Sequence, residues 1–304
     1  MAIKRNANFR TFLISSLLIA VTTTASCTPV PPANGRPPLD ADGMKTYAVI
    51  FDQVAAALIQ AWNRRTPDLM SPYIRGDIIH QRYNDESALD DDSRLSLLNR
   101  SFLANPDYEA RLSNTFIGRH DGFIVNESWN WQPVITGANW TEDHPLTEYH
   151  WIGFDEGKIS DWWLMYAREL HAAIGRPLDQ TLLQDYAAAW SSGDAEVVAN
   201  LYTPNGARRD ALLEENQWGN AAVKEFAAKF FAWYPHVSLD LLQSFGELPA
   251  GTKIGAVYAI HVANRTGRPC DIRALILFEP DGQKIATEWV FYQAQSLLDC
   301  GWAR

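Results

Sequence analysis

The chain has 304 residues, of which 47% are hydrophobic and 20% charged, and its formal net charge is −10 at pH 7. This acidic balance excludes a protein that binds nucleic acid through a broad basic surface, and the apolar content excludes wholesale disorder. The length favours two small domains over one large one. Beyond the N-terminal segment, the sequence has no apolar run of about 18 residues, the minimum for a membrane-spanning helix.

Residues 1–26 have the pattern of a secretory signal peptide, with a basic start formed by Lys4, Arg5 and Arg10. The apolar stretch Phe12–Val21 is too short to span a membrane, and Ala25-Ser26-Cys27 resembles a bacterial lipobox. A lipobox cysteine is lipidated and becomes the mature N-terminus, although Thr24 stands where a leucine is usual. We expect a cell-envelope lipoprotein, anchored through Cys27 on the periplasmic or extracellular face. The alternative is cleavage near Ser26 and a soluble secreted protein.

The segment after Cys27 is rich in proline, with five prolines between Thr28 and Leu39. Such a composition favours an extended polyproline II conformation of about 3.1 Å per residue and excludes a helix. We therefore predict that residues 27–46 form a semi-rigid tether that holds the rest of the protein away from a membrane.

If Cys27 carries lipid, Cys270 and Cys300 are an even pair in an oxidising compartment, which favours a disulfide between them. The alternative is two free thiols. The spacing of the three cysteines does not fit a zinc site, and we assign no metal and no cofactor.

The two halves of the chain begin and end with similar sequences. Tyr47–Trp62 and Leu182–Trp190 have helical periodicity, and their final Ala-Trp pairs are 128 positions apart. Residues 158–166 and 284–292 share Lys, Ile, Trp and Tyr at an offset of 126, and each follows an acidic turn that contains glycine. These offsets predict a duplication, with a first domain at 47–170, a second at 180–304, and a joint at Ala167–Asp179.

Each copy places helices before strands, which is typical of an α+β fold. The second copy has a predicted helix at Asn220–Trp233, followed by four strands at about 237–245, 253–264, 271–278 and 283–293. We expect a curved antiparallel sheet that wraps around the helices.

The second copy, from Leu182 to Gln295, resembles the SnoaL-like branch of the NTF2-like superfamily. The resemblance rests on an Ala-Trp helix end, a Gly-Asp, a Leu-Tyr, a helix before a proline, and the final hairpin turn Asp281-Gly282-Gln283-Lys284-Ile285. The first copy resembles it more weakly, at Trp62, Tyr73 and Gly157-Lys158-Ile159. The resemblance implies two tandem cone-shaped α+β barrels, each enclosing an apolar pocket. The family includes polyketide cyclases, ketosteroid isomerases, dehydratases and domains that only bind or dimerise, so the fold does not fix the chemistry.

In SnoaL-like enzymes a His-Asp pair often follows the Leu-Tyr segment. The matching positions are His80 and Gln81 in the first copy, and Arg209 and Asp210 in the second, so neither copy has both members. Asp210 as general base with Tyr258 or His261 as donor would suit proton abstraction next to a carbonyl. The alternative is a structural Arg209–Asp210 pair at the surface, and a structural role for His261.

In the first copy, Glu148 and His150 share a strand face near His80, a weak pattern for a metal site that we do not assign. The resemblance also gives Glu288, on the last strand, as a pocket or rim residue. Aromatic residues predicted to line the cones are Trp62, Trp163, Tyr166, Trp190, Trp233, Trp289 and Tyr292. Their alternative role is ordinary core packing.

Two functions follow. The first is a non-catalytic lipoprotein that binds a small apolar molecule or a protein partner; the second is a cofactor-independent isomerase, cyclase or dehydratase. An open cone with a buried carboxylate would favour an enzyme, and a cone filled by its own aromatic residues would favour binding. Adjacent strand tryptophans such as Trp162 and Trp163 point to opposite faces. We therefore expect the two copies to pack on each other as an intrachain pseudo-dimer.

Overall fold

The computed structural model describes residues 41–74, 80–81, 107–118, 121–130, 140–155, 158–213, 215–247, 253–263 and 269–300. All of them lie in one compact unit, Pro38–Arg304. The expected signal peptide, Cys27 and the proline-rich part of the tether lie outside the described residues. Among the described helices, none combines the length and the apolar character needed to cross a membrane.

The N-terminal half contains two helices followed by strands, as the sequence predicts. Its elements are α1 (Ala41–Arg64), η1 (Pro67–Tyr73), β1 (His80–Gln81), β2 (Glu109–Ile117), β3 (Asp121–Trp129), β4 (Leu146–Asp155) and β5 (Lys158–Ala167). Helix α1 begins at Ala41, so the tether predicted to reach residue 46 is too long. The proline-rich run ends at Pro38. No proline follows it before Tyr47, so a helix can start before Tyr47.

The C-terminal half also begins with helices and also contains a series of four long strands. Its elements are α3 (Arg168–Ala173), α4 (Thr181–Ser191), α5 (Ala195–Ala199), β6 (Tyr202–Asp210), β7 (Gln217–Trp218), α6 (Asn220–Trp233), β8 (His236–Gly246), β9 (Ile254–Ala263), β10 (Pro269–Asp281), β11 (Lys284–Tyr292) and α7 (Ala294–Asp299). The predicted joint therefore contains a short helix, α3. The β10–β11 hairpin turns at Gly282, whose φ of 61° lies in the left-handed region that glycine adopts without strain.

Strand pairing follows one scheme in both halves. Strands β2 to β5 form an antiparallel meander, and β1 pairs in parallel with β5. Strands β8 to β11 form a second meander, and β6 pairs in parallel with β11. The meanders join at β5–β8 and at β2–β11, so that the ring β10-β9-β8-β5-β4-β3-β2-β11 closes into an eight-stranded barrel.

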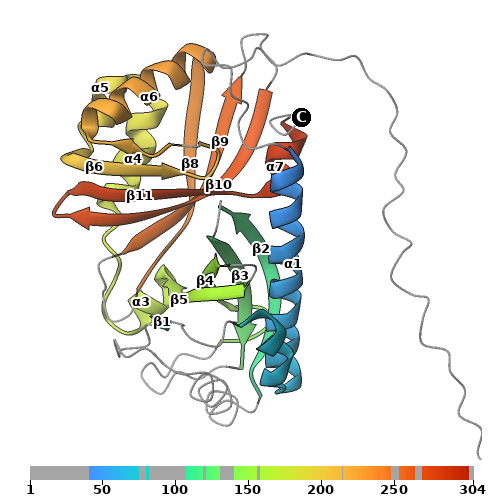
Figure 1. Ribbon diagram of the computed structural model, residues 1–304. Helices are drawn as coiled ribbons and strands as arrows, with labels where there is room; N and C mark the ends of the chain where they lie inside the picture. Colours follow the sequence, from blue (N-terminus) through green and yellow to red (C-terminus); the bar gives the residue numbers. More distant parts are fainter. Residues whose placement is uncertain are drawn as a thin grey trace, which may run out of the picture. The chain divides into compact units, whose positions relative to one another are not determined.

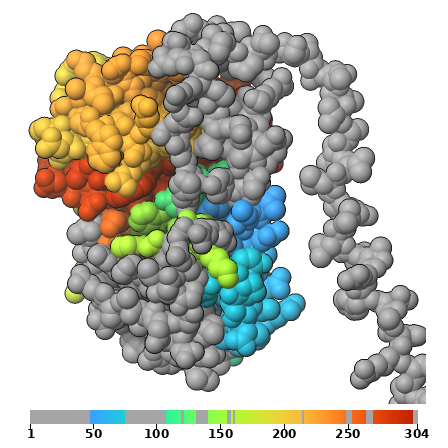
Figure 2. All heavy atoms as spheres, viewed as in Figure 1, coloured from blue at the N-terminus to red at the C-terminus, as the bar shows by residue number. Residues whose placement is uncertain are grey.

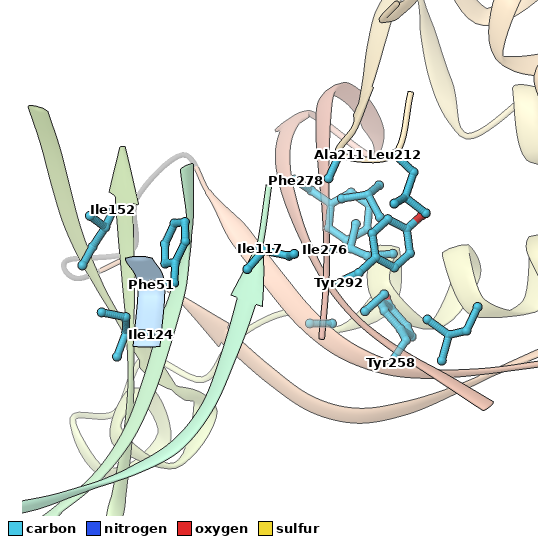
Figure 3. Close-up of a cluster of buried hydrophobic side chains, with 14 of the residues drawn as sticks. Phe51, Ile117, Ile124, Ile152, Ala211, Leu212, Tyr258, Ile276, Phe278 and Tyr292 are labelled. Atoms are coloured by element: carbon cyan, nitrogen blue, oxygen red, sulfur yellow. The ribbon is translucent and has the colours of Figure 1, made fainter. Parts of the chain in front are cut away.

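The helices pack on the sheet and bury a large apolar core. Helix α1 runs along β2, while α4, α5 and α6 gather beside β6 and β8 (Figure 1). Figure 3 shows Phe51, Ile124 and Ile152 in the N-terminal half, and Tyr258 and Tyr292 in the C-terminal half. Ile117 of β2 lies between the two groups and pairs with Tyr292, so the core is continuous through the join.

A second apolar cluster fills the space between the two meanders, and we call it the inter-sheet core. It contains Phe116, Phe123, Val125, Tyr149, Met165 and Ala167 from β2 to β5, and Phe245, Val257, Leu275, Leu277 and Phe291 from β8 to β11. Tyr149 stacks on Phe245 with ring centroids 3.9 Å apart. Phe245 also requires Gly255, because a Cβ at that position would lie 2.3 Å from the Phe245 ring. Burial of these side chains holds the two halves together.

A disulfide joins Cys270, in β10, to Cys300, which follows α7, with Cα atoms 5.4 Å apart. This distance is inside the limit of about 7 Å for a bridge without backbone movement. The bond fixes the C-terminal helix against the first strand of the final hairpin.

Candidate functional site

The C-terminal half contains a buried polar cluster centred on Glu288, which we call the Glu288 network. Its members are Tyr186 of α4, Tyr202, Arg208 and Asp210 of β6, and Glu288 and Tyr292 of β11. Arg208 and Asp210 alternate on the same face of β6, and the parallel register places Glu288 beside Arg208. The Glu288 side chain is fully buried, and Arg208 and Asp210 are 5% and 6% exposed.

Each carboxylate in this network accepts several hydrogen bonds. Tyr186 donates to Glu288 Oε1 at 2.6 Å, and Tyr202 and Arg208 also donate to this carboxylate. Asp210 Oδ2 accepts from Arg208 at 2.7 Å and from the Tyr292 hydroxyl at 2.9 Å. The backbone N–H of Leu212 donates to Asp210 Oδ1 at 3.0 Å. One guanidinium therefore bridges two carboxylates that four further donors hold in place.

The surroundings keep the network in one protonation state. Burial and the Glu288 charge raise the pKa values of Tyr186 and Tyr202 far above their usual range, so both remain donors. Burial alone would lower the pKa of Arg208, but the adjacent Glu288 raises it and keeps the guanidinium charged. The guanidinium also lies 5.0 Å from the ring centroids of Trp190 and Phe226. This arrangement suits a structural ion pair.

The structure does not assemble the predicted catalytic set. Asp210 lies in the Glu288 network, but the Tyr258 hydroxyl donates to the Leu183 carbonyl at 2.9 Å. His261 lies on the opposite, exposed face of β9, with its ring nitrogens 2.8 Å from Asp271 Oδ1 and 3.1 Å from Asp240 Oδ2. His80 is in β1, opposite Asp161 of β5, and its side chain is outside the described part of the chain.

The alternative of a surface Arg209–Asp210 pair is also wrong. The partner of Asp210 is Arg208, and the pair is buried. Arg209 points to the other face of β6, where its guanidinium lies 5.7 Å from the ring centroid of Trp218 and 5.5 Å from that of Trp289. Strand alternation separates Arg209 from its neighbours on both sides.

The aromatic residues predicted to line the pockets lie in different parts of the structure. Trp62, Trp190 and Tyr292 belong to the large core, and Tyr166 packs with Leu146 and Leu170. Trp163 and Trp289 instead contact Trp151 beside the inter-sheet core, because they follow inward-facing residues on their strands. Trp233, near the end of α6, is 38% exposed, so it does not line a cone interior.

The N-terminal half contains a second buried polar cluster, centred on Glu148 of β4, which we call the Glu148 cluster. Glu148 Oε2 accepts from the Tyr108 hydroxyl at 2.6 Å and from Asn126 Nδ2 at 2.9 Å. Two residues along β4, His150 Nδ1 accepts from Trp162 Nε1 at 3.0 Å. Burial raises the pKa of Glu148 and lowers that of His150 to about 3, so His150 is neutral.

Unlike the Glu288 network, the Glu148 cluster has no cationic side chain bonded to its carboxylate in the described structure. It also keeps an unused donor and an unused acceptor, because His150 Nε2 and Asn126 Oδ1 are buried without hydrogen-bond partners among the described residues. Buried polar atoms are normally paired with protein, water or ligand. Within the described residues, these two atoms therefore lack the pairing that buried polar atoms normally have.

A surface hollow of about 440 Å³ lies at the same end of this half. It is lined by Asn63, Arg65, Asp107, Glu109 and Asn130. Asp107 and Glu109 flank Tyr108, whose hydroxyl reaches Glu148. The Tyr108 side chain therefore extends from a backbone segment beside the hollow to the buried carboxylate.

Sequence reasoning missed Tyr108, Asn126, Tyr186, Tyr202 and Arg208. The alternation of Arg208 with Asp210 on one strand was an available signal for a buried ion pair. The tyrosines had no such signal, since they come from separate elements. No group of three histidine, cysteine, aspartate or glutamate side chains within the described ranges is arranged to hold a metal ion.

Comparison with known proteins gives a match for the C-terminal half. Residues 183–288 match the model of the SnoaL-like domain family. A search of curated proteins found no match to the chain.

Several solved structures resemble part of the chain at low sequence identity. A hypothetical protein with a ketosteroid isomerase-like fold from Catenulispora acidiphila, in complex with trimethylamine, is 16% identical, with a TM-score of 0.38, over 42% of this chain and 96% of that one. A putative SnoaL-like polyketide cyclase from Shewanella putrefaciens is 13% identical, with a TM-score of 0.35, over 40% of this chain and 93% of that one. A putative polyketide cyclase from Xanthomonas campestris is 21% identical, with a TM-score of 0.34, over 39% and 92%.

The match over residues 183–288 covers α4 to β11 almost completely, and these elements hold the Glu288 network. Over residues 183–288, the C-terminal half of this chain is therefore similar to the SnoaL-like domain family.

Proposed function

We propose that this protein is a lipoprotein of the bacterial cell envelope, anchored through Cys27, whose function is to bind a small, largely apolar molecule. In this proposal it has two NTF2-like domains, which form an intrachain pseudo-dimer. The SnoaL-like domain serves structure, and the divergent N-terminal domain does the binding.

The strand order supports two copies of one fold. In each half a four-stranded antiparallel meander is extended by a parallel strand, β1 beside β5 and β6 beside β11. A helix and a short second helix precede this parallel strand in both halves. A shared order that includes a parallel pairing supports duplication more strongly than a meander alone, because parallel pairs need a long connection.

The inter-sheet core supports the pseudo-dimer. Phe123 of β3 contacts Phe245 of β8 and Phe291 of β11, with ring centroids 6.0 and 5.0 Å apart. The Tyr149 hydroxyl donates to Gln243 Oε1 at 2.8 Å across the same join. Side chains of this size would be exposed to water if either half stood alone.

The observation that favours binding over catalysis is the burial and hydrogen bonding of Glu288. A general base must be free to take a proton from a substrate, and it must lie within hydrogen-bond reach of that proton. Glu288 is fully buried and accepts from Tyr186, Tyr202 and Arg208. Aromatic side chains fill its surroundings, with Tyr186 packed against Trp190, Tyr258 and Phe278. Figure 2 shows the residues of this half, coloured yellow to red, closely packed on the face in view.

The test is the substitution Glu288→Gln, with Glu225→Gln as the control, because Glu225 is an exposed residue that forms an i,i+4 ion pair with Lys229. If Glu288 is structural, its replacement removes a buried ion pair and lowers the free energy of unfolding by about 3 kcal/mol, since Arg208 keeps Asp210 as a partner. The control should change by less than about 0.5 kcal/mol. An equal or higher stability of Glu288→Gln would instead favour a strained catalytic carboxylate and contradict the proposal.

The anchor is tested separately. Cys27→Ala should release the protein from the membrane fraction, because acyl chains contribute about 0.8 kcal/mol for each buried methylene. Mass spectrometry of the wild type should find an acylated N-terminal cysteine. An unmodified Cys27, or membrane association that does not depend on it, would contradict the localisation.

A further inference from the structure

We propose that Arg209 and the two indoles beside it, Trp218 and Trp289, form a surface site for a sugar that carries one carboxylate group. We call these three residues the Arg209 site. It lies on the face of β6 and β11 opposite the Glu288 network, outside the cone of the C-terminal half. Such a site goes beyond the proposed binding of an apolar molecule and does not depend on it.

Strand alternation and register bring the three side chains together. Arg209 and Trp289 each follow a member of the Glu288 network on their strands, so both point to the opposite face. Strands β6 and β11 run side by side (Figure 1), and their parallel register pairs Arg209 with Trp289. Trp218 of β7 is opposite Ala207, which shares a face with Arg209. The guanidinium therefore lies over both indole rings.

The contacts with the indoles leave the hydrogen-bond donors of Arg209 unused. A guanidinium has five N–H donors, and an indole has no hydrogen-bond acceptor, so a cation–π contact satisfies none of them. Arg209 is exposed, and no acceptor among the described residues is bonded to its guanidinium. The Arg209 site thus offers a positive charge and directed donors to a group from outside.

Two other arginines of the chain show which group completes such an arrangement. The Arg111 guanidinium lies 5.6 Å from the ring centroid of Trp129, and its Nε donates to Glu127 at 2.7 Å. Arg208 likewise lies over an indole and bridges the two carboxylates of the Glu288 network. The component that Arg209 lacks is therefore a carboxylate, whose two oxygens match the fork of the guanidinium.

The charge of the protein limits the charge of the ligand. The formal net charge of the chain is −10, so a ligand with many negative charges is repelled. One carboxylate balances the one unpaired guanidinium of the site. This balance favours a singly charged ligand over a polyanion.

Trp218 indicates the kind of body to which the carboxylate is attached. This residue is 62% exposed, so a ligand that covers its ring keeps its own outer side in water. A pyranose ring presents an apolar C–H face to an indole and keeps its hydroxyl groups hydrated. An aromatic acid would instead leave its second apolar face exposed to water.

Trp289 gives the site a fixed base. It is half-buried and contacts Trp151 with ring centroids 5.7 Å apart. Trp151 Nε1 in turn donates to Asp121 Oδ2 at 3.1 Å. A side chain that is already held in place loses little conformational entropy when a ligand binds.

The experiment titrates the full chain, labelled with nitrogen-15 in its tryptophan side chains, with methyl β-D-glucuronide and methyl β-D-glucoside. These probes differ only in a carboxylate in place of a hydroxymethyl group. The indole N–H resonance of Trp218, assigned by its loss in Trp218→Phe, should shift saturably with the glucuronide. The Kd of the glucuronide should be about tenfold lower than that of the glucoside, the factor expected for one charge-assisted hydrogen bond.

Variants separate the charge from the ring. Arg209→Gln should abolish the preference, so that both probes bind with the affinity of the glucoside. Arg111→Gln is the matched control and should retain the preference, because Arg111 also lies over an indole but already has Glu127 as its partner. Trp218→Ala, followed at the Trp289 resonance, should weaken both probes about fivefold.

If Arg209→Gln does not fold, the salt dependence of the wild type answers the same question. An increase of about tenfold in salt concentration should weaken binding of the glucuronide and not of the glucoside, because salt screens an exposed ion pair. Equal affinity for the two probes, or an unchanged preference in a folded Arg209→Gln variant, would overturn the inference. Acetate that binds as tightly as the glucuronide would show a site for any small anion, and tighter binding of benzoate would show a site for aromatic acids. Either result would overturn the assignment to a sugar.

Discussion

The Glu288 network allows a quantitative prediction from one substitution, Arg208→Met. Methionine is unbranched, flexible and uncharged, so the change removes the bridge between Glu288 and Asp210 and keeps most of the apolar stem of the side chain. Removing one partner of a buried ion pair costs about 3–5 kcal/mol, because the remaining charge stays buried and uncompensated. Here the substitution strands two carboxylates, which have side chains 0% and 3% exposed.

Two features of the structure determine where in this range of about 3–5 kcal/mol the loss of unfolding free energy should lie. Both carboxylates keep neutral donors, Tyr186 and Tyr202 for Glu288, and Tyr292 with the Leu212 N–H for Asp210. The substitution also removes the cation–π contacts to Trp190 and Phe226, each worth up to about 2 kcal/mol when desolvated. We therefore expect a loss of about 4 kcal/mol.

The assay is urea unfolding, followed by circular dichroism and by tryptophan fluorescence. The midpoint should fall with an unchanged m-value if only the folded state is affected. The double variant Arg208→Met/Glu288→Gln should recover part of the loss, because it removes one of the stranded charges. A loss of less than about 1 kcal/mol for Arg208→Met would refute an electrostatic role for the network. The same conclusion would follow if the losses of Arg208→Met and Glu288→Gln were simply additive in the double variant.

Three further predictions concern other parts of the structure. Replacing both Cys270 and Cys300 by serine should lower the free energy of unfolding by about 3–4 kcal/mol in the chain-entropy model, and an unchanged urea midpoint would contradict this. Hydrogen bonds to Asp271 and Asp240 raise the pKa of His261, so its contribution is present below the unfolded pKa of about 6.5 and is lost as pH rises through the folded value. The melting temperature of His261→Gln should therefore fall further below that of the wild type at pH 5.5 than at pH 8.5, and an equal difference at both would refute this. Phe245→Ala should cost about 3–5 kcal/mol in urea unfolding because the ring is fully buried against Tyr149 and Gly255, and a loss below about 1 kcal/mol would show that the two halves do not depend on this contact.

The sequence alone determined α4, α6 and the four strands β8 to β11 of the C-terminal half with good accuracy. Periodicity placed α6 at Asn220–Trp233 and the strands within a few residues of β8 to β11. These signals are local, because an amphipathic helix or an alternating strand shows its buried face in its own residues. The resemblance of Leu182–Gln295 to SnoaL-like domains rests on sequence motifs and not on periodicity, and residues 183–288 match the model of that family.

Only the tertiary structure decided which polar residues meet. Arg208 and Glu288 are 80 positions apart, and Tyr108 and Glu148 are 40 positions apart, so neither contact has a local signature. The alternation of side chains along a strand indicates that Arg208 and Arg209 face opposite sides of the sheet, but it does not indicate which of them faces the core. That choice depends on the side of the sheet that the helices cover, and the covering helices come from other parts of the chain. The sequence prediction for Asp210 therefore had the right residue and the wrong partner.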